Sequence, residues 1–403
     1  MNTRFSALAV FLSVIYSTCI WAVPAAPLQL ELSQPDGTIF TAIPRGDEYA
    51  NWMETTAGHS IVKYNGTWFY AERDNAGTLT ATGDMVGSLS AIELQSMPTH
   101  LAPTPDPQAF EESTIRKSPR GTSINNQNFS QAQAVSHTQY VLTVLADYTD
   151  QDFTYSDDSF QSLIYGASDS VREFFLENSY GGFTVAAATE SEGVANDGII
   201  HVSRAVTHPD PGGDSSASRT EAREIVNLVD SYIDFSAYDT NFDGRVSEDE
   251  LSIVIILAGY ETSYGGESSA LTPNVWGHRW SFPSDLTLDG VDLRPYTMFG
   301  EAHATNNGNK HQATIGIMCH ELGHLMLGLP DLYDTDGGSN GIGDWGLMGG
   351  GSWNVESGWL GTSPSHLSAW SKVATGLTVP EDIDSDQSGV SIAKADSNEV
   401  AKR

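Results

Sequence analysis

The sequence predicts an α+β domain preceded by a small β-rich module. Two continuous apolar runs, Tyr140–Ala146 (YVLTVLA) and Ile253–Ala258 (IVIILA), are typical of buried strands. Two other segments, 159–178 and 218–233, are expected to be helices, so strands and helices mix in the main domain. From residue 28 to about residue 94, short strands alternate with turn residues, which indicates a separate β-rich module.

The composition excludes two classes of partner and one class of structure. The 403 residues include 19 Lys and Arg against 52 Asp and Glu, which gives a formal net charge of −33. Such a surface repels phosphate groups, so we expect no nucleic-acid or anionic-membrane partner. Hydrophobic residues make up 39% of the chain, enough for a packed core, which excludes wholesale disorder.

The N-terminus has the pattern of a secretory signal peptide. A short head with one basic residue, Met1–Arg4, precedes an apolar stretch over 5–23, and small residues follow. We expect residues 1–25 to be removed and the protein to be secreted; the alternative is a membrane anchor, but no basic stop-transfer cluster follows. No other segment approaches the roughly 20 apolar residues of a membrane span. Cys319 is then the one remaining cysteine, so an internal disulfide is excluded.

Composition divides the exported chain into four parts. Residues 26–97 form the β-rich module, and residues 98–137 are a linker rich in Pro, Ser, Thr, Asn and Gln. The linker holds a basic cluster, Arg116–Arg120, which is either a processing site or part of a solvated spacer. Residues 138–380 form the main domain, and the polar residues 381–403 are a tail or the start of a further module.

The most informative motif is HELGH at residues 320–324. His320 and His324 are four residues apart in an apolar segment, so on a helix they share one face and can bind one Zn²⁺. Glu321 can then reach a zinc-activated water as a general base. Gly328 and Pro330 are placed to end the helix. Chance gives at most about 0.04 such motifs per chain of this composition, so a hydrogen-bonded pair of core histidines is the weaker alternative.

A catalytic zinc requires a third protein ligand, and aspartates follow the helix. Asp331 lies just beyond the predicted turn, from which its side chain can swing back to the metal; Asp344 is the second choice. Between residues 341 and 353 the chain is rich in glycine and contains Met348. This methionine is expected either to pack beneath the two histidines or to fill the core.

A second motif predicts a calcium site. Residues 239–250 (DTNFDGRVSEDE) match the twelve-residue EF-hand loop, although an acidic turn is the alternative. A strand-like run follows and there is no second loop, which favours a structural clamp over a sensor. The expected ligands are Asp239, Asn241, Asp243, the Arg245 carbonyl, Ser247 through water, and Glu250, with Gly244 at the sharp turn.

The run HELGH…GLPDLYD followed by GDWGLMGGGSWN resembles the immune inhibitor A family of secreted bacterial zinc metallopeptidases, which is similar to the metzincins. The resemblance covers residues 28 to 380 and is ordered along the chain. Further matching stretches are Gly46–Tyr49 with Asn51-Trp52, Val171–Phe183, Asn274–Trp280, Tyr296–Glu301 and Ser363–Lys372.

The resemblance implies a zincin-like domain with a mixed twisted sheet, an active-site helix and a methionine turn. It implies His320 and His324 as zinc ligands, Glu321 as base and Met348 as the turn methionine. It also implies calcium near the acidic loop. The sequence departs from the family pattern in one respect: Gly328 follows the second histidine by four residues rather than three, and Asp331 is displaced equally.

These observations predict a secreted zinc endopeptidase, made as a precursor, that hydrolyses peptide bonds of extracellular proteins. Its partners are protein or peptide substrates. One alternative is a catalytically inactive, calcium-stabilised zincin that acts as a binding or adhesion module, and another is a hydrolase of non-peptide substrates. The spacing leaves the second electrophile open among Tyr333, His303, His366 and Arg279.

Overall fold

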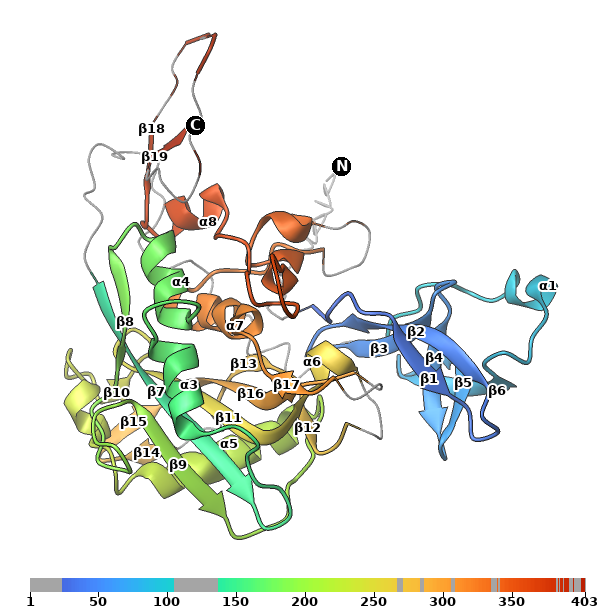
Figure 1. Ribbon diagram of the computed structural model, residues 1–403, viewed down its shortest axis with the longest axis horizontal. Coiled ribbons are helices and arrows are strands. Elements are labelled where there is room, and N and C mark those ends of the chain that lie inside the picture. Colours follow the sequence, from blue (N-terminus) through green and yellow to red (C-terminus); the bar gives the residue numbers. More distant parts are fainter. Residues whose placement is uncertain are drawn as a thin grey trace, which may run out of the picture.

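The computed structural model describes residues 24–104, 137–266, 271–282, 286–305, 309–334, 339, 341–381, 383, 385–386, 388–390, 394 and 400–402. The predicted signal peptide up to residue 23 lies outside these residues, as do positions 105–136 with the basic cluster Arg116–Arg120. Figure 1 shows a small N-terminal module beside a larger domain.

The N-terminal module is an antiparallel six-stranded sheet in the order β1-β2-β3-β4-β5-β6. Apolar side chains such as Ile61, Trp68 and Tyr70 form its own core, which confirms the β-rich module. The predicted linker begins later than residue 98, because the Leu101 N–H donates to Ser60 Oγ at 3.1 Å and holds this stretch to the sheet. The elements are β1 Leu30–Ser33, β2 Ile39–Gly46, β3 Asn51–Thr55, β4 Ser60–Tyr64, β5 Thr67–Arg73, β6 Leu79–Met85 and α1 Ala91–Leu94.

The larger domain is built on a mixed eight-stranded sheet with the path β13-β16-β11-β7-β8. The two predicted apolar runs are its parallel central pair, β7 (His137–Tyr148) and β11 (Ser252–Glu261). His137 therefore belongs to a strand and not to the linker. Strand β13 (His278–Ser281) runs antiparallel to β16 (Pro295–His303) at one edge. The other strands are β8 Phe183–Ala187, β9 Ile199–Arg204, β12 Asn274–Val275 and β17 His311–Gln312.

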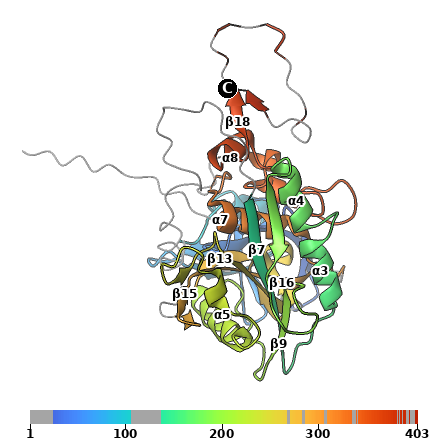
Figure 2. The same cartoon turned by 90° about the vertical axis from the view of Figure 1, so that its left-hand side faces the viewer.

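Helices cover both faces of this sheet. On one face lie α3 (Asp157–Tyr165), α4 (Val171–Asn178) and the buried helix α7 (Ile315–Leu327); α5 (Ser215–Val229) lies on the other (Figure 2). Successive side chains of β11 point to opposite faces of the sheet, as they do in any pleated strand. Val254 and Ile256 belong to the cluster that includes α7, whereas Ile253, Ile255 and Leu257 belong to the cluster that includes α5.

Two helix predictions were wrong in their bounds. The segment 159–178 is two helices, because Ser170 takes an extended conformation and caps α4, accepting from the Glu173 N–H at 3.0 Å. Helix α5 begins before Ser218, because the Asp214 side chain caps it and accepts from the N–H groups of Ser216 and Ala217. In both cases an Asp or Ser oxygen decides where the first turn begins.

Short elements complete the described chain, and the predicted tail contributes β19, which pairs in parallel with β18. Among the described residues, no helix is long and apolar enough to cross a membrane.

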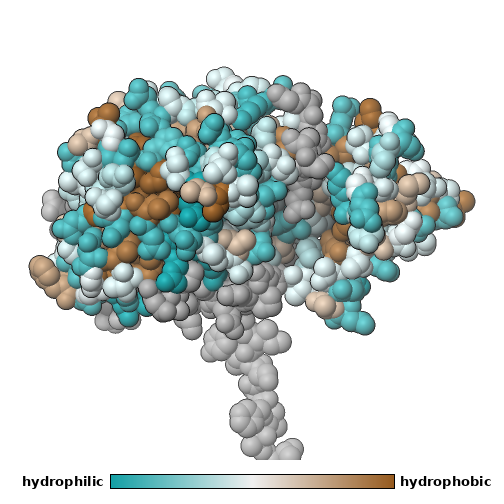
Figure 3. All heavy atoms as spheres, turned by 90° about the horizontal axis from the view of Figure 1, so that it is seen from below, coloured by the Kyte–Doolittle hydropathy of each residue, from teal (hydrophilic) through white to brown (hydrophobic). Residues whose placement is uncertain are grey.

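Hydrophilic residues dominate the face seen in Figure 3, and apolar ones form small groups there. The remaining elements are η1 Phe235–Tyr238, β10 Arg245–Val246, α6 Thr262–Gly265, β14 Thr287–Leu288, β15 Val291–Leu293, η2 Gly343–Trp345, η3 Gly350–Trp353, α8 Ala369–Ala374, β18 Val379–Glu381 and β19 Val400–Lys402.

Val254→Ala tests the central strand. The side chain is fully buried in β11, so we expect its truncation to lower the free energy of unfolding by about 2–3 kcal/mol, from lost transfer energy and the cavity left behind. The matched control Val194→Ala removes an exposed side chain and should cost less than about 0.5 kcal/mol. Urea denaturation measures both, and equal losses would contradict the placement of this strand.

Candidate metal centre

Helix α7 brings the HELGH motif to the centre of the domain. Every residue of the helix is buried, in agreement with its apolar sequence. It ends at Gly328, as predicted, in a left-handed conformation (φ 61°) that favours glycine. The Gly328 N–H donates to the His324 carbonyl at 3.1 Å, and the Leu329 N–H donates to the Gly323 carbonyl at 3.2 Å. This turn returns the chain towards the histidines.

Two backbone carbonyls fix the orientation of the imidazole rings. His320 Nδ1 lies 2.9 Å from the Leu347 carbonyl, and His324 Nδ1 lies 2.6 Å from the Leu329 carbonyl. A carbonyl only accepts, so each Nδ1 carries the proton and each Nε2 presents a lone pair. The two Nε2 atoms lie 3.0 Å apart.

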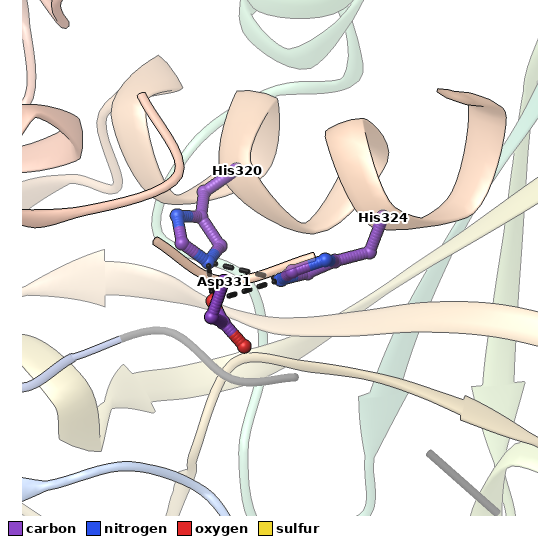
Figure 4. Close-up of side chains that lie close together, drawn as sticks. All are labelled: His320, His324 and Asp331. Carbon is purple, nitrogen blue, oxygen red and sulfur yellow. Dashed lines mark hydrogen bonds and ion pairs between the residues drawn. The ribbon is translucent and has the colours of Figure 1, made fainter. Parts of the chain in front are cut away.

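Asp331 completes a group of three converging side chains (Figure 4). Its Oδ1 lies 3.0 Å from His320 Nε2 and 3.3 Å from His324 Nε2. In the described part of the chain, this is the one set of three His, Cys, Asp or Glu residues whose ligand atoms lie within 4.8 Å of one another. The second choice, Asp344, is exposed on η2 and does not join the set.

The geometry of the three donors fits zinc. Two ligands about 2.0–2.1 Å from one tetrahedral metal lie about 3.3 Å apart, close to the observed separations of 3.0, 3.0 and 3.3 Å. Two imidazole lone pairs and a carboxylate oxygen repel one another when buried together without a proton or cation between them. Two nitrogens and one oxygen also form the ligand set of a catalytic zinc that keeps one open position.

Glu321 is buried beside this group. Neither of its carboxyl oxygens has a hydrogen-bond partner in the described part of the protein. Burial raises the pKa of Glu321 to about 8, although the charge of His320 opposes the shift. A buried carboxyl group without a partner is costly for folding, and such groups gather at sites of chemistry.

Met348 lies against the middle of α7, where it was predicted. A Cβ atom at Gly323 would lie 2.8 Å from Met348 Sδ, so the glycine allows the methionine to reach the helix backbone between the two histidines. The preceding residue, Leu347, provides the carbonyl that orients His320. Leu347 and Met348 therefore both contact the part of α7 that carries the two histidines.

The four candidate electrophiles separate into two pairs. Tyr333 and Arg279 act electrostatically on the centre. Burial raises the pKa of Tyr333 and the charge of Asp331 adds to this shift, whereas the charge of Arg279 opposes the larger effect of burial on Glu321. His303 is instead stacked on an aromatic ring in the core, and His366 pairs with a glutamate on α4, with 2.9 Å between the two side chains.

One turn of the N-terminal module, for which no role was predicted, also reaches this centre. Asp47, Glu48 and Tyr49 join β2 to β3, and Asp47 Oδ2 accepts from the Tyr333 hydroxyl at 3.5 Å. Burial raises the pKa of Asp47 to about 7, and burial followed by the charge of Glu321 raises that of Glu48. The one sequence feature that pointed to this turn was the resemblance of Gly46–Tyr49 to the immune inhibitor A family, and a resemblance does not say what the turn contacts.

The predicted calcium ligands lie in one closed loop. Glu250 Oε1 accepts from the Thr240 N–H at 2.8 Å, and Asp239 Oδ2 accepts from the Gly244 N–H at 3.0 Å. Gly244 has φ 80°, as the sharp turn requires. The carboxylates of Asp239, Asp243 and Glu250 do not form a set within 4.8 Å among the described residues. The loop thus has the predicted turn, with its acidic groups further apart than the zinc ligands.

Comparison with known proteins identifies a family for the larger domain. The family model described as immune inhibitor A peptidase M6, catalytic domain, matches residues 138–377, which is more than half of the chain. The match contains α7, Asp331 and Met348 and excludes the six-stranded sheet. No curated protein matches the chain.

The edge strand β13 predicts an acid sensitivity. Burial lowers the pKa of His278 to about 3, although a hydrogen bond with the Trp276 carbonyl opposes the shift. Below about pH 6.5 the His278 ring takes up a proton in the unfolded chain but not in the folded chain. The contribution of the neutral ring to the free energy of unfolding is therefore present above about pH 6.5 and is lost as the pH falls. Between pH 7 and pH 5 the loss is about 2 kcal/mol.

His278→Gln should remove this part of the pH dependence. Urea denaturation at pH 7 and pH 5 compares the wild type with the variant, and the control His100→Gln changes an exposed ring of the other module. We expect the wild type and the control to lose about 2 kcal/mol more than His278→Gln. Identical losses in all three proteins would show that the ring of His278 accepts a proton in the folded state.

Proposed function

We propose a specific reaction for this chain, which belongs to the immune inhibitor A family of M6 zinc metallopeptidases: the hydrolysis of internal peptide bonds in extracellular proteins. Peptidase activity follows from family membership. The convergence of His320, His324 and Asp331 beside a buried Glu321 supports the assignment of the active site to these residues. The helix, glycine turn and methionine beneath it support a zincin-like domain with a methionine turn.

Each side chain of the proposed site has a distinct task. Zinc, when bound by His320, His324 and Asp331, supplies a Lewis acid that polarises water and the scissile carbonyl group. Glu321 takes the proton of the attacking water and delivers it to the leaving amine. Burial excludes competing solvent from this carboxyl group, so the proton that it takes from water can pass to the leaving amine. Tyr333 and Arg279 face the developing negative charge as candidate electrophiles.

We further propose that the protein is exported and made as a zymogen. The basic head and apolar stretch of residues 1–25 support a signal peptide. Residues 26–97 would form the propeptide, and cleavage at Arg116–Arg120 in the linker would separate it from the peptidase. Contact between the module and the proposed active site supports this division.

The loop of residues 239–250 is proposed to bind calcium as a structural clamp. Its twelve positions match an EF-hand loop, and its backbone already makes the turn at Gly244. Strand β11 begins at Ser252, two residues after Glu250, so an ion bound there would fix one end of the central sheet.

Glu321→Gln tests the proposed base. The variant keeps the shape of the side chain but cannot accept a proton, so we expect kcat/KM on casein to fall by at least about 100-fold. Zinc content, measured by atomic absorption, should stay at one per chain. The control Glu224→Gln lies on α5 at the opposite face of the sheet and should keep wild-type activity. Retained casein hydrolysis by Glu321→Gln would refute the mechanism; an intact biological effect without hydrolysis would favour a binding module.

Calcium removal tests the clamp. Because a ligand that binds only the folded state stabilises it, we expect EGTA to lower the melting temperature by about 5 °C while zinc stays bound. Glu250→Gln should melt at the lower temperature with or without calcium, and Glu224→Gln should respond as the wild type does. Superimposable melting curves of the wild type with and without calcium would contradict the proposed site.

A further inference from the structure

We propose that the turn Asp47–Tyr49 is a built-in inhibitor that covers the metal centre, with Tyr49 in the place of an aromatic substrate side chain. The proposal rests on the peptidase function given above and deepens it in two ways. It names the residues that keep the precursor inactive, and it names the class of side chain that the substrate site accepts.

The burial of this turn requires the larger domain. The turn lies at the tip of the β2–β3 hairpin, a position that faces solvent in a small isolated sheet. Yet Asp47, Glu48 and Tyr49 are only 7%, 2% and 4% exposed. The turn is also closed internally, because Asp47 Oδ1 accepts from the N–H groups of Tyr49 and Ala50 at 2.9 Å each. It therefore meets the larger domain as a preformed unit.

The groups that face this turn are those of the proposed active site. Asp47 contacts the Tyr333 hydroxyl, two residues beyond the third zinc ligand. The charges of Glu321 and Asp331 act on the Glu48 carboxyl group. A peptide substrate has to reach the same base to be hydrolysed, so the turn and a substrate compete for one place.

Tyr49 is the anchor of this contact. In the described chain it is the one residue of the N-terminal module that belongs to the hydrophobic cluster on the α5 side of the sheet. This cluster includes Trp280 on the edge strand β13, and Tyr333 packs against it. Burial raises the pKa of the Tyr49 hydroxyl group, and the charges of Glu48 and Asp331 add to this shift.

A site that holds Tyr49 in this way should hold an aromatic substrate side chain. An aromatic ring buries a large apolar area at low entropic cost, and a tyrosine at the middle of a contact surface commonly dominates binding. Removal of the module would leave an apolar wall with Arg279 and Tyr333 at its rim. Such a site favours Tyr or Phe over small or acidic side chains.

Contacts on both sides of the turn hold it in place. The Ala26 N–H donates to the Ser263 carbonyl at 2.7 Å, and Trp353 Nε1 donates to the Pro24 carbonyl at 2.8 Å. At the hairpin itself, Gly266 leaves room for Met53 of β3, because a Cβ at this glycine would lie 3.0 Å from the Met53 sulfur. These attachments fix the approach of the hairpin, so little further ordering is needed for inhibition.

The first test measures the uncut full-length chain on a short fluorogenic peptide. We expect Tyr49→Ala to raise activity at least tenfold over the uncut wild type, and Tyr49→Phe, which keeps the ring, to stay as inactive as the wild type. The matched control Tyr64→Ala removes a tyrosine that is 64% exposed on the same module and should change nothing. Thermal unfolding of each uncut variant shows whether the fold is kept.

Cleavage of the linker and removal of the module should make all four proteins equally active. If the processed wild type hydrolyses peptides and uncut Tyr49→Ala stays inactive, the inhibitor role of Tyr49 is overturned. Full activity of the uncut wild type would overturn it as well. If no processed protein hydrolyses any peptide, the proposed peptidase function is wrong for this chain. The binding measurement below then tests whether the turn occupies the site, without any need for activity.

The second test uses a cyclised peptide of residues 45–51 and reads binding to the processed chain by fluorescence polarisation. We expect the peptide to bind and a peptide with Ala at the Tyr49 position to bind at least tenfold more weakly. In a substrate series that varies one residue, Tyr or Phe should give at least tenfold higher kcat/KM than Ala or Glu. Equal binding of both cyclised peptides, or a preference for Ala or Glu, would overturn the assignment of this site to aromatic side chains.

Discussion

Two hydrogen bonds to backbone carbonyls determine the chemistry of this protein. The Leu347 and Leu329 carbonyls take the Nδ1 protons of the two motif histidines, so both Nε2 lone pairs point at Asp331. Without these bonds the rings could rotate or change tautomer, and the three donors would not converge. Both carbonyls come from segments after α7, so the glycine turn that ends this helix is as necessary as the histidines.

Buried carboxyl groups around the centre reduce stability in favour of function. Besides Glu321, burial raises the pKa of Glu261 to about 7 at the end of β11, against the effect of its hydrogen bonds from Gly300 and Gly277. The N–H of Gly300 in β16 donates to Glu261 at 3.0 Å, and the N–H of Gly277, the residue just before β13, donates to it at 2.8 Å. Glu261 therefore connects β16 to the start of β13. A buried acid thus sets the position of the edge strand while it adds negative charge beside Glu321, as expected where a site departs from ordinary packing rules.

The sequence predicted what depends on local spacing. The i, i+4 histidines, the end of α7 at Gly328 and the return of Asp331 all follow from positions within a dozen residues. It could not predict the start of α5, because Asp214 competed with Ser218 as a cap, and both residue types suit that role. Nor could it assign the turn at Asp47, since that turn meets Tyr333 only after two separate sheets have folded and packed together.

X-ray absorption at the zinc edge of the metal-loaded chain tests whether His320, His324 and Asp331 bind the metal together. We predict two imidazole nitrogens and a carboxylate oxygen at about 2.0–2.2 Å from the zinc, with the outer-shell scattering of two histidine rings. Replacement of Asp331 by Ala should remove one oxygen and leave both rings. A sulfur scatterer at about 2.3 Å, or a spectrum without two imidazoles, would contradict this set of zinc ligands.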